Sequence, residues 1–197
     1  HTGLIFTADS EIVEYLQGYA EQKKIGISIQ PDKEDGKCLR VIVGNGQGGG
    51  RHRNANNPGW ILGQMGLLGS KRIPQEYISN SSEVRLGLLA GLIDSDGYYD
   101  APSKSYEITQ NIEPLARQIK FVADSLGFRT SIHEKTAESQ LGTSSQVWRV
   151  RIMGDVERIP VLIERKKATP RTINKDWRVT GIQIEADTVD EFYGFKI

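Results

Sequence analysis

The stretch that decides the fold is Leu86-Gly87-Leu88-Leu89-Ala90-Gly91-Leu92-Ile93-Asp94-Ser95-Asp96-Gly97. Its small residues and its first aspartate recur at three- and four-residue spacings, so they share one helical face: Gly87, Ala90, Gly91 and Asp94. Small side chains on that face allow the backbone of a second helix to approach closely. The bulky residues between them cover most of the remaining circumference, which predicts a helix buried on most sides. Such a helix suits the centre of a two-fold or pseudo-two-fold assembly.

The end of this run carries the chemistry. We expect the helix, capped at Asn80 or Ser81, to run to about Ile93 and to end in a turn from Asp94 to Gly97. A carboxylate beside a helix C-terminus is unfavourable unless something compensates it, and a divalent cation would do so. Two such helices side by side would pair their carboxylates as ligands for Mg²⁺, which can activate water for attack at phosphorus. The alternative is a plain buried helix that merely ends there.

An internal repeat surrounds this helix. The order strand, helix, strand, strand is expected at 3–7, 11–24, 25–29 and 39–43, and again at 106–109, 113–126, 128–132 and 147–152. Helix positions of the two copies match at a constant offset, pairing Leu16, Tyr19 and Ala20 with Ile119, Val122 and Ala123. The strands alternate apolar and polar residues, so each sheet should have one exposed face. In the second copy that face would carry Arg149 and Arg151.

The segments between the copies are less informative. A glycine-rich loop at 44–50 lacks the ending of a phosphate-binding loop, so a flexible surface loop is the simpler interpretation. A short helix is expected within 57–68, followed by a linker that ends at Pro74. Only the second copy is preceded by the small-residue helix. Internal symmetry therefore predicts an equivalent helix just before His1.

Composition sets the limits. The chain has 197 residues, 25 basic and 25 acidic, so its net charge is zero, which counts somewhat against nucleic-acid binding. Charge could still be segregated, because basic residues cluster at 51–53, 71–72 and 165–167. The single cysteine, Cys38, excludes an internal disulfide and fits a reducing compartment. No apolar run approaches the roughly 18 residues that a membrane span requires.

The run from Leu89 to Gly97 resembles the signature of LAGLIDADG homing endonucleases and departs from the consensus only at Ser95. The surrounding chain is similar to the endonuclease domain found inside inteins. Residues 66–74 resemble the linker before the second motif, and 180–197 resemble strands that re-enter the splicing domain, as in inteins of a fungal pre-mRNA-splicing factor. That group would make the location intracellular, and nuclear if the host is a splicing factor.

The resemblance implies an α+β fold. In this LAGLIDADG homing-endonuclease fold, two pseudo-symmetric mixed α/β repeats form a DNA-binding saddle, and a C-terminal strand segment returns to a Hint-type splicing domain. We accordingly expect a first repeat at 1–79, its own motif helix lying upstream. The second repeat would span 80–172 with its motif helix at 81–97, and 173–197 would form the C-terminal strands.

The resemblance also assigns roles to residues. Asp96 matches the metal-binding catalytic acid of the second motif, with Mg²⁺ as cofactor, whereas Asp94 takes a helix-end role. Lys71 and Lys167 each lie three residues before a proline and match lysines that assist catalysis, although Lys166 competes with Lys167 for that place. A lysine near the metal can polarise water and offset transition-state charge. Candidate DNA contacts are Arg51, Arg53, Gln110, His133, Arg149 and Arg151.

These assignments predict a site-specific, Mg²⁺-dependent double-strand DNA endonuclease of the intein-associated type. Its partners would be double-stranded target DNA, the host protein's exteins and the remaining splicing segments, without a membrane. The splicing nucleophile and the terminal His-Asn pair of inteins are not found within these residues, so splicing would need other segments. Two alternatives remain: a degenerate intein insertion that binds DNA or is only structural, and a maturase-like protein that binds intron RNA.

Overall fold

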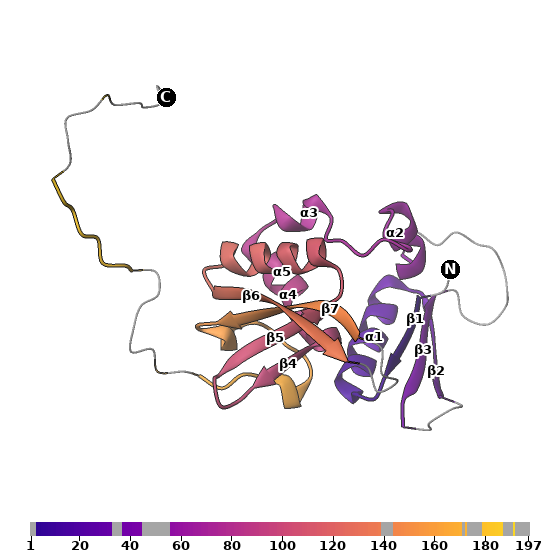
Figure 1. Cartoon of the computed structure of the whole chain (residues 1–197). Helices are drawn as coiled ribbons and strands as arrows, with labels where there is room; N and C mark the ends of the chain where they lie inside the picture. Colours follow the sequence, from indigo (N-terminus) through magenta and orange to yellow (C-terminus); the bar gives the residue numbers. More distant parts are fainter. Residues whose placement is uncertain are drawn as a thin grey trace.

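The computed structural model describes residues 3–32, 37–44, 56–138, 144–170, 172, 179–186 and 191. The chain forms two α/β units that lie side by side (Figure 1). Two predicted DNA contacts, Arg51 and Arg53, lie outside the described residues, as do most of the glycine-rich loop and much of the segment after 172. No helix of the described part is long and apolar enough to cross a membrane.

The N-terminal unit is an antiparallel sheet of three strands with one long helix on it. Its elements are β1 (Gly3–Thr7), α1 (Ser10–Lys23), β2 (Gly26–Pro31), β3 (Leu39–Gly44) and the short α2 (Pro58–Gln64). The strand order is β1-β3-β2. Alternating strand residues turn one face of the sheet toward α1, where Val41 and Val43 pack with Val13 and Leu16 in a small core.

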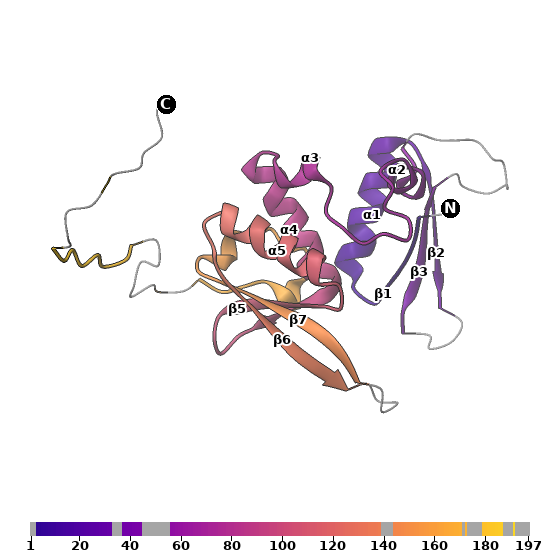
Figure 2. The same cartoon turned by 45° about the horizontal axis from the view of Figure 1, so that its top comes forward.

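The C-terminal unit is larger and contains the signature helix. Its elements are α3 (Gln75–Ile78), α4 (Ser82–Asp96), β4 (Gly97–Asp100), β5 (Ser105–Gln110), α5 (Glu113–Ser125), β6 (Arg129–Glu138), β7 (Ser144–Met153) and two 3₁₀ turns, η1 (Val156–Arg158) and η2 (Glu164–Lys166). The strand order is β4-β5-β7-β6, and every pairing is antiparallel. Both α4 and α5 pack on one face of this sheet around the main core (Figure 2).

The expected internal repeat is confirmed. The series β1-α1-β2-β3 and β5-α5-β6-β7 have the same order along the chain and the same strand order in their sheets. Two of the three matched pairs of helix positions also agree, because Leu16 and Ala20 are buried in α1 as Ile119 and Ala123 are in α5. In the third pair Val122 is buried and Tyr19 is half-buried. The two units are therefore structural copies, and the second carries α4 and β4 in addition.

The end of α4 differs from the expectation. The predicted turn from Asp94 to Gly97 is wrong, because α4 continues through Asp96 and the chain passes directly into β4, a strand that the sequence did not predict. A Cβ at Gly97 would lie 2.8 Å from Ile93 Cα and 3.2 Å from Ile108 Cγ1, so only glycine fits between the helix and β5. The start of α4 is as expected, since Ser81 Oγ accepts a hydrogen bond from the Val84 amide.

The segment beyond the C-terminal unit shows no secondary structure where it is described. Residues 179–186 form no strand, and their apolar side chains Val179, Ile182 and Ile184 are exposed. Strands need a neighbouring strand for their backbone hydrogen bonds, and the described residues offer none there. The expected return of this segment to a splicing domain stays a prediction.

Candidate active site

The small-residue face of α4 lines a groove of about 700 Å³ between the two units. Gly87, Ala90, Gly91 and Asp94 form one wall, and residues from β1 and α1, such as Ile5 and Leu16, form the other. A Cβ added at Gly87 or Gly91 would meet no described atom within 4 Å. The predicted close-approach face is therefore open toward the N-terminal unit.

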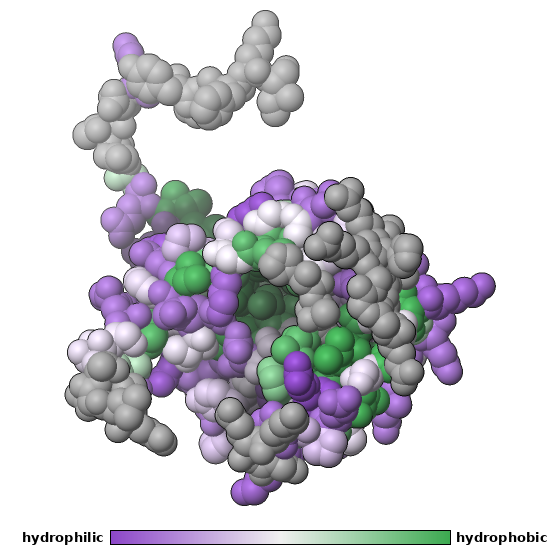
Figure 3. Space-filling view, turned by 90° about the vertical axis from the view of Figure 1, so that its right-hand side faces the viewer, coloured by the Kyte–Doolittle hydropathy of each residue, from purple (hydrophilic) through white to green (hydrophobic). Residues whose placement is uncertain are grey.

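The N-terminal unit contributes apolar surface. Its exposed large apolar side chains include Leu4, Phe6 and Tyr15. Figure 3 looks onto the side of the molecule where this unit lies and shows hydrophobic surface gathered around a hollow. Phe6 and Tyr15 also line the groove beside α4. The groove thus combines small residues on one wall with apolar residues on the other, which suits an apolar helix.

Asp96 lies at the end of this groove. It is the last residue of α4, it lines the groove, and it is exposed. Its Oδ2 accepts a hydrogen bond of 3.2 Å from Gln110 Nε2, at the end of β5. Gln110 itself is only 6% exposed, so a buried side chain fixes this oxygen of Asp96. The other carboxylate oxygen of Asp96 has no partner among the described residues and is accessible to a ligand.

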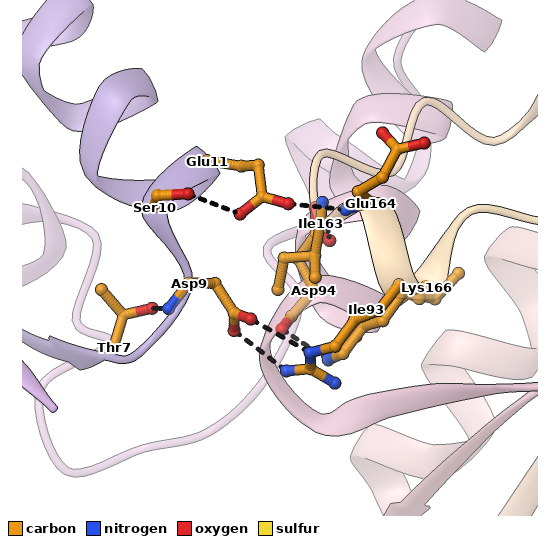
Figure 4. Close-up of polar contacts among 10 residues, drawn as sticks. Thr7, Asp9, Ser10, Glu11, Ile93, Asp94, Ile163, Glu164 and Lys166 are labelled. Carbon is orange, nitrogen blue, oxygen red and sulfur yellow. Dashed lines mark hydrogen bonds and ion pairs between the residues drawn. The ribbon is translucent and has the colours of Figure 1, made fainter. Parts of the chain in front are cut away.

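Asp94 is buried and structural. It is 9% exposed, and its two carboxylate oxygens accept hydrogen bonds from the backbone amides of Leu162 (3.0 Å) and Ile163 (3.2 Å). These bonds hold the returning segment at residues 162–163 against α4, and Figure 4 shows Asp94 and Ile163. Charge-assisted bonds of this kind are about twice as strong as neutral ones. The helix-end role expected for Asp94 thus takes the form of an anchor for η2.

Lys166 compensates the helix end. Its buried Nζ donates to the carbonyl oxygens of Ile93 (2.8 Å) and Asp94 (2.7 Å), the last turn of α4. A cation there offsets the negative end of the helix dipole. Burial, followed by repulsion from Arg165, lowers the pKa of Lys166 below its usual 10.5. Its backbone oxygen is fixed by Tyr106, whose hydroxyl donates to it at 2.8 Å; burial raises the pKa of Tyr106 to about 12.

The segment that carries Lys166 also joins the two units. Arg165 donates to both carboxylate oxygens of Asp9, at 3.1 and 3.0 Å. The Glu164 amide donates to Glu11 Oε1 at 2.9 Å, and this bond is the main reason that the pKa of Glu11 lies below its usual 4.5 (Figure 4). Both carboxylates come from the start of α1. The turn η2 therefore fixes α4 on one side and α1 on the other.

The two lysines predicted to assist catalysis lie elsewhere. Lys71 is exposed, does not line the groove, and has no polar partner among the described residues. The neighbouring Ile73 is held by Gln118 of α5, which pairs with its amide (2.8 Å) and its carbonyl (3.1 Å). Lys167 is exposed and forms an ion pair with Glu164. Lys166 is the lysine that the structure brings to the end of α4, as the alternative interpretation of the sequence allowed.

The predicted DNA contacts on the second sheet fall on two sides. His133, Arg149 and Arg151 share the face opposite to the helices, as their pairing across β6 and β7 and the strand alternation require. Gln110 lies on the helix side with Asp96. Sequence reasoning missed Glu107 and Asp100, which pair with Arg149 (3.2 Å) and Arg151 (2.9 Å). Strand alternation places Glu107 on the arginine face, and that was the available signal.

The described residues fit part of a metal site. They contain no group of three or more His, Cys, Asp or Glu side chains that could hold a metal ion. Mg²⁺ needs fewer protein ligands, because it keeps several waters and is commonly bound by one or two carboxylates together with substrate phosphates. The exposed Asp96 supplies one such carboxylate. The described residues thus fit a Mg²⁺ ion only in part, through this one carboxylate.

Comparisons with known proteins agree with this geometry. Residues 83–158 match the family model of the LAGLIDADG-like domain. The chain is 30% identical over 131 residues to the ATP-dependent DNA helicase Hel308 of Thermococcus kodakarensis, a match that covers 60% of this chain and 12% of the helicase. It is 28% identical over 149 residues to the homothallic switching endonuclease of Saccharomyces cerevisiae, covering 68% of this chain and 25% of that protein. The chain thus spans a small part of both relatives.

A solved structure shares the fold. A variant of the homing endonuclease I-DmoI, in complex with its target DNA in the presence of magnesium, superposes with a TM-score of 0.50 at 15% identity. The superposition covers 77% of this chain and 73% of the I-DmoI chain. A share this large exceeds either unit alone, so the shared fold includes parts of both. Residues 83–158 therefore resemble the LAGLIDADG-like domain, and the chain has an α+β fold similar to that of a homing endonuclease.

Proposed function

We propose that this chain is the DNA-binding and catalytic part of a site-specific double-strand DNA endonuclease. The observation that carries the proposal is the position of Asp96. It is an exposed carboxylate at the last residue of a helix whose small-residue face lines an open groove. The structurally similar I-DmoI was solved in complex with its target DNA, and the similar yeast protein is named an endonuclease.

The groove supports a second helix with a second acid. Close packing of two helices through glycine and alanine brings their ends together, so a second carboxylate would come to lie beside Asp96. Internal symmetry assigns this helix to the N-terminal unit, where β1 forms the edge of its sheet and the groove wall is apolar. The helix would come from another segment of the protein or from a partner chain.

A divalent ion shared by the two carboxylates would neutralise charge at the scissile phosphate and favour the attack of water. The chain's own residues would prepare this site. Gln110 orients one oxygen of Asp96 by a hydrogen bond of 3.2 Å. Lys166 stabilises the turn of α4 from which Asp96 projects. We therefore assign the lysine near the acid to Lys166, and keep Lys71 and Lys167 as phosphate-binding candidates, because both are exposed.

We further propose that the domain is an intein insertion in a host protein. Its similarity to a helicase is confined to 12% of that protein, and its similarity to an endonuclease to 25%. A segment that resembles a small part of a helicase and a small part of an endonuclease behaves as a transferable module. The exposed apolar residues of 179–186 would pack on splicing strands of the same intein. If the host is a splicing factor, the expected location is the nucleus.

The test compares binding with cutting. The longest form of the protein is incubated with Mg²⁺ and with DNA of the host allele that lacks the insertion. The expected result is cleavage of both strands at one site, lost in Asp96→Asn and kept in Ser95→Ala, a matched control at the neighbouring exposed position. Binding by the parent protein without cleavage would contradict the nuclease and support the degenerate, non-cleaving alternative.

A further inference from the structure

The arginine face of the C-terminal sheet, which lies opposite to the helices and carries Arg149 and Arg151, holds charges of both signs. Arg149 and Arg151 lie on it, and two carboxylates, Glu107 and Asp100, pair with them. The centre of this face therefore carries two positive and two negative charges. A surface that binds DNA only through its phosphates gains affinity from unpaired cations. This region is better suited to contacts that require orientation than to contacts that require net charge.

The two arginines are held differently. Arg151 donates through Nε to Ser105 (3.0 Å) and through Nη2 to Asp100 (2.9 Å) and Ser103 (2.7 Å), and its Nε also lies 3.6 Å from Glu107. Most of its donors are thus used within the protein. Its side chain is 34% exposed. Arg151 therefore ties β7 to the β4–β5 turn and has little capacity left for a ligand.

Arg149 contacts a carboxylate only through its inner nitrogen, and this contact is an ion pair without a hydrogen bond of good geometry. Its Nε lies 3.2 Å from Glu107 Oε2, and neither terminal nitrogen has a hydrogen-bond or ion-pair partner among the described residues. The side chain is 40% exposed. A guanidinium paired with a carboxylate at Nε leaves Nη1 and Nη2 as a pair of parallel donors. Such a pair matches O6 and N7 of guanine, the commonest specific contact in the major groove.

Glu107 is the group that orients Arg149. Its side chain is 7% exposed, and its Oε2 makes no hydrogen bond of good geometry with the described residues, although the ion pair to Arg149 is short. Burying a carboxylate without full compensation is costly, so its presence needs a reason. It is too buried to reach a base directly. The carboxylate also lies beside Tyr98, whose pKa is raised by burial and by Glu107.

We propose that Arg149 reads one guanine in the major groove of duplex DNA and that Glu107 is its positioning residue. The proposal rests on the proposed DNA-binding function. Arg151 then has a structural role, and phosphate contacts fall to exposed cations at the rim, such as Lys135 on β6. The specificity of this face would come from the geometry of Arg149 rather than from its charge.

The experiment uses the 197-residue chain and a pool of randomised duplex DNA, with bound and unbound fractions sequenced. The parent should enrich a sequence with guanine at one defined position. Arg149→Ala should reduce the preference at that position by about 5- to 150-fold. The control Lys135→Ala should weaken binding to all sequences and lower the salt dependence by about one phosphate contact, with the guanine preference unchanged.

Glu107→Gln separates positioning from a merely structural role. Removing one negative charge should raise affinity for unselected DNA, whereas the guanine preference at the Arg149 position should fall. Weaker binding to every sequence with an unchanged preference would overturn the assignment, as would an Arg149→Ala protein that selects the parent's motif. A parent that binds DNA without preference overturns this inference alone. A parent that binds no duplex overturns the proposed function as well.

Discussion

The two aspartates of the signature, two residues apart, should respond to the same substitution in opposite ways. Asp94→Asn should lower the free energy of unfolding, whereas Asp96→Asn should leave it nearly unchanged. The reason is their surroundings. Asp94 is buried and accepts two backbone amides, at 3.0 and 3.2 Å, while Asp96 is exposed and accepts one side-chain amide at 3.2 Å.

The size of the effect follows from the hydrogen bonds. An asparagine at position 94 keeps one acceptor oxygen and turns an NH₂ group toward the other backbone N–H. One charge-assisted bond worth roughly 1.5–3 kcal/mol is lost, and a buried N–H is left unsatisfied at a cost of about 1–3 kcal/mol. The expected loss is about 3 kcal/mol. At position 96 the asparagine oxygen can still accept from Gln110, so the change should stay within about 0.5 kcal/mol.

The assay is equilibrium urea unfolding of the whole chain, followed by tryptophan fluorescence, since Trp148 packs against the main core. The free energy of unfolding is compared between the parent and the two variants. A loss below about 1 kcal/mol for Asp94→Asn would refute the anchoring role of its carboxylate. Equal losses at both positions would refute the division between a structural and an exposed acid.

Four further predictions concern α4 and the contacts of η2. Lys166→Met should lower the free energy of unfolding by about 2 kcal/mol in the same assay, because two helix-end carbonyls lose their donor; an unchanged value would contradict the cap. The pKa of Glu11 is lowered, so its bond to the Glu164 amide should be present above pH 4.5 and be lost as the pH falls through the lowered value; the amide's NMR shift should show this, and Glu11→Gln should abolish it. Gly91→Ala should stabilise this chain by roughly 0.5–1 kcal/mol, because the added Cβ would meet nothing within 4 Å. The same change should reduce DNA cleavage by the longest form of the protein, because a second helix would pack against this position. Equal cleavage by the parent and the variant would argue against that helix. Gly97→Ala should destabilise by about 1–3 kcal/mol in urea, since its Cβ would lie 2.8 Å from Ile93 Cα, and a neutral result would show that the backbone there can move.

The repeat and the buried helix could be predicted because they depend on periodicity. Apolar spacing placed Leu16 and Ile119 on the inner faces of their helices, and both are buried. Small-residue spacing placed Gly87 and Gly91 on one face, and both line the groove. The end of α4 was mispredicted because Gly97 signalled a turn, whereas it serves a close approach to Ile93.

The contacts of the site depend on tertiary packing, which a single sequence does not contain. Nothing in the local pattern tells Lys166 from Lys167, because both are lysines in the same turn. Their difference arises from the direction of η2, which aims one side chain at the end of α4 and the other at Glu164. Likewise, the pairing of Arg149 with Glu107 depends on the register between β5 and β7.

We propose that Asp96 supplies a metal-binding carboxylate at the end of α4. The most direct measurement is an electron paramagnetic resonance titration of Mn²⁺ with the longest form of the protein bound to its DNA. Asp96→Asn should weaken Mn²⁺ binding by at least about 10-fold at unchanged DNA affinity, because a hard divalent ion loses a charged oxygen ligand. Ser95→Ala should bind the ion like the parent. Equal Mn²⁺ affinity in the parent and in Asp96→Asn would contradict the account.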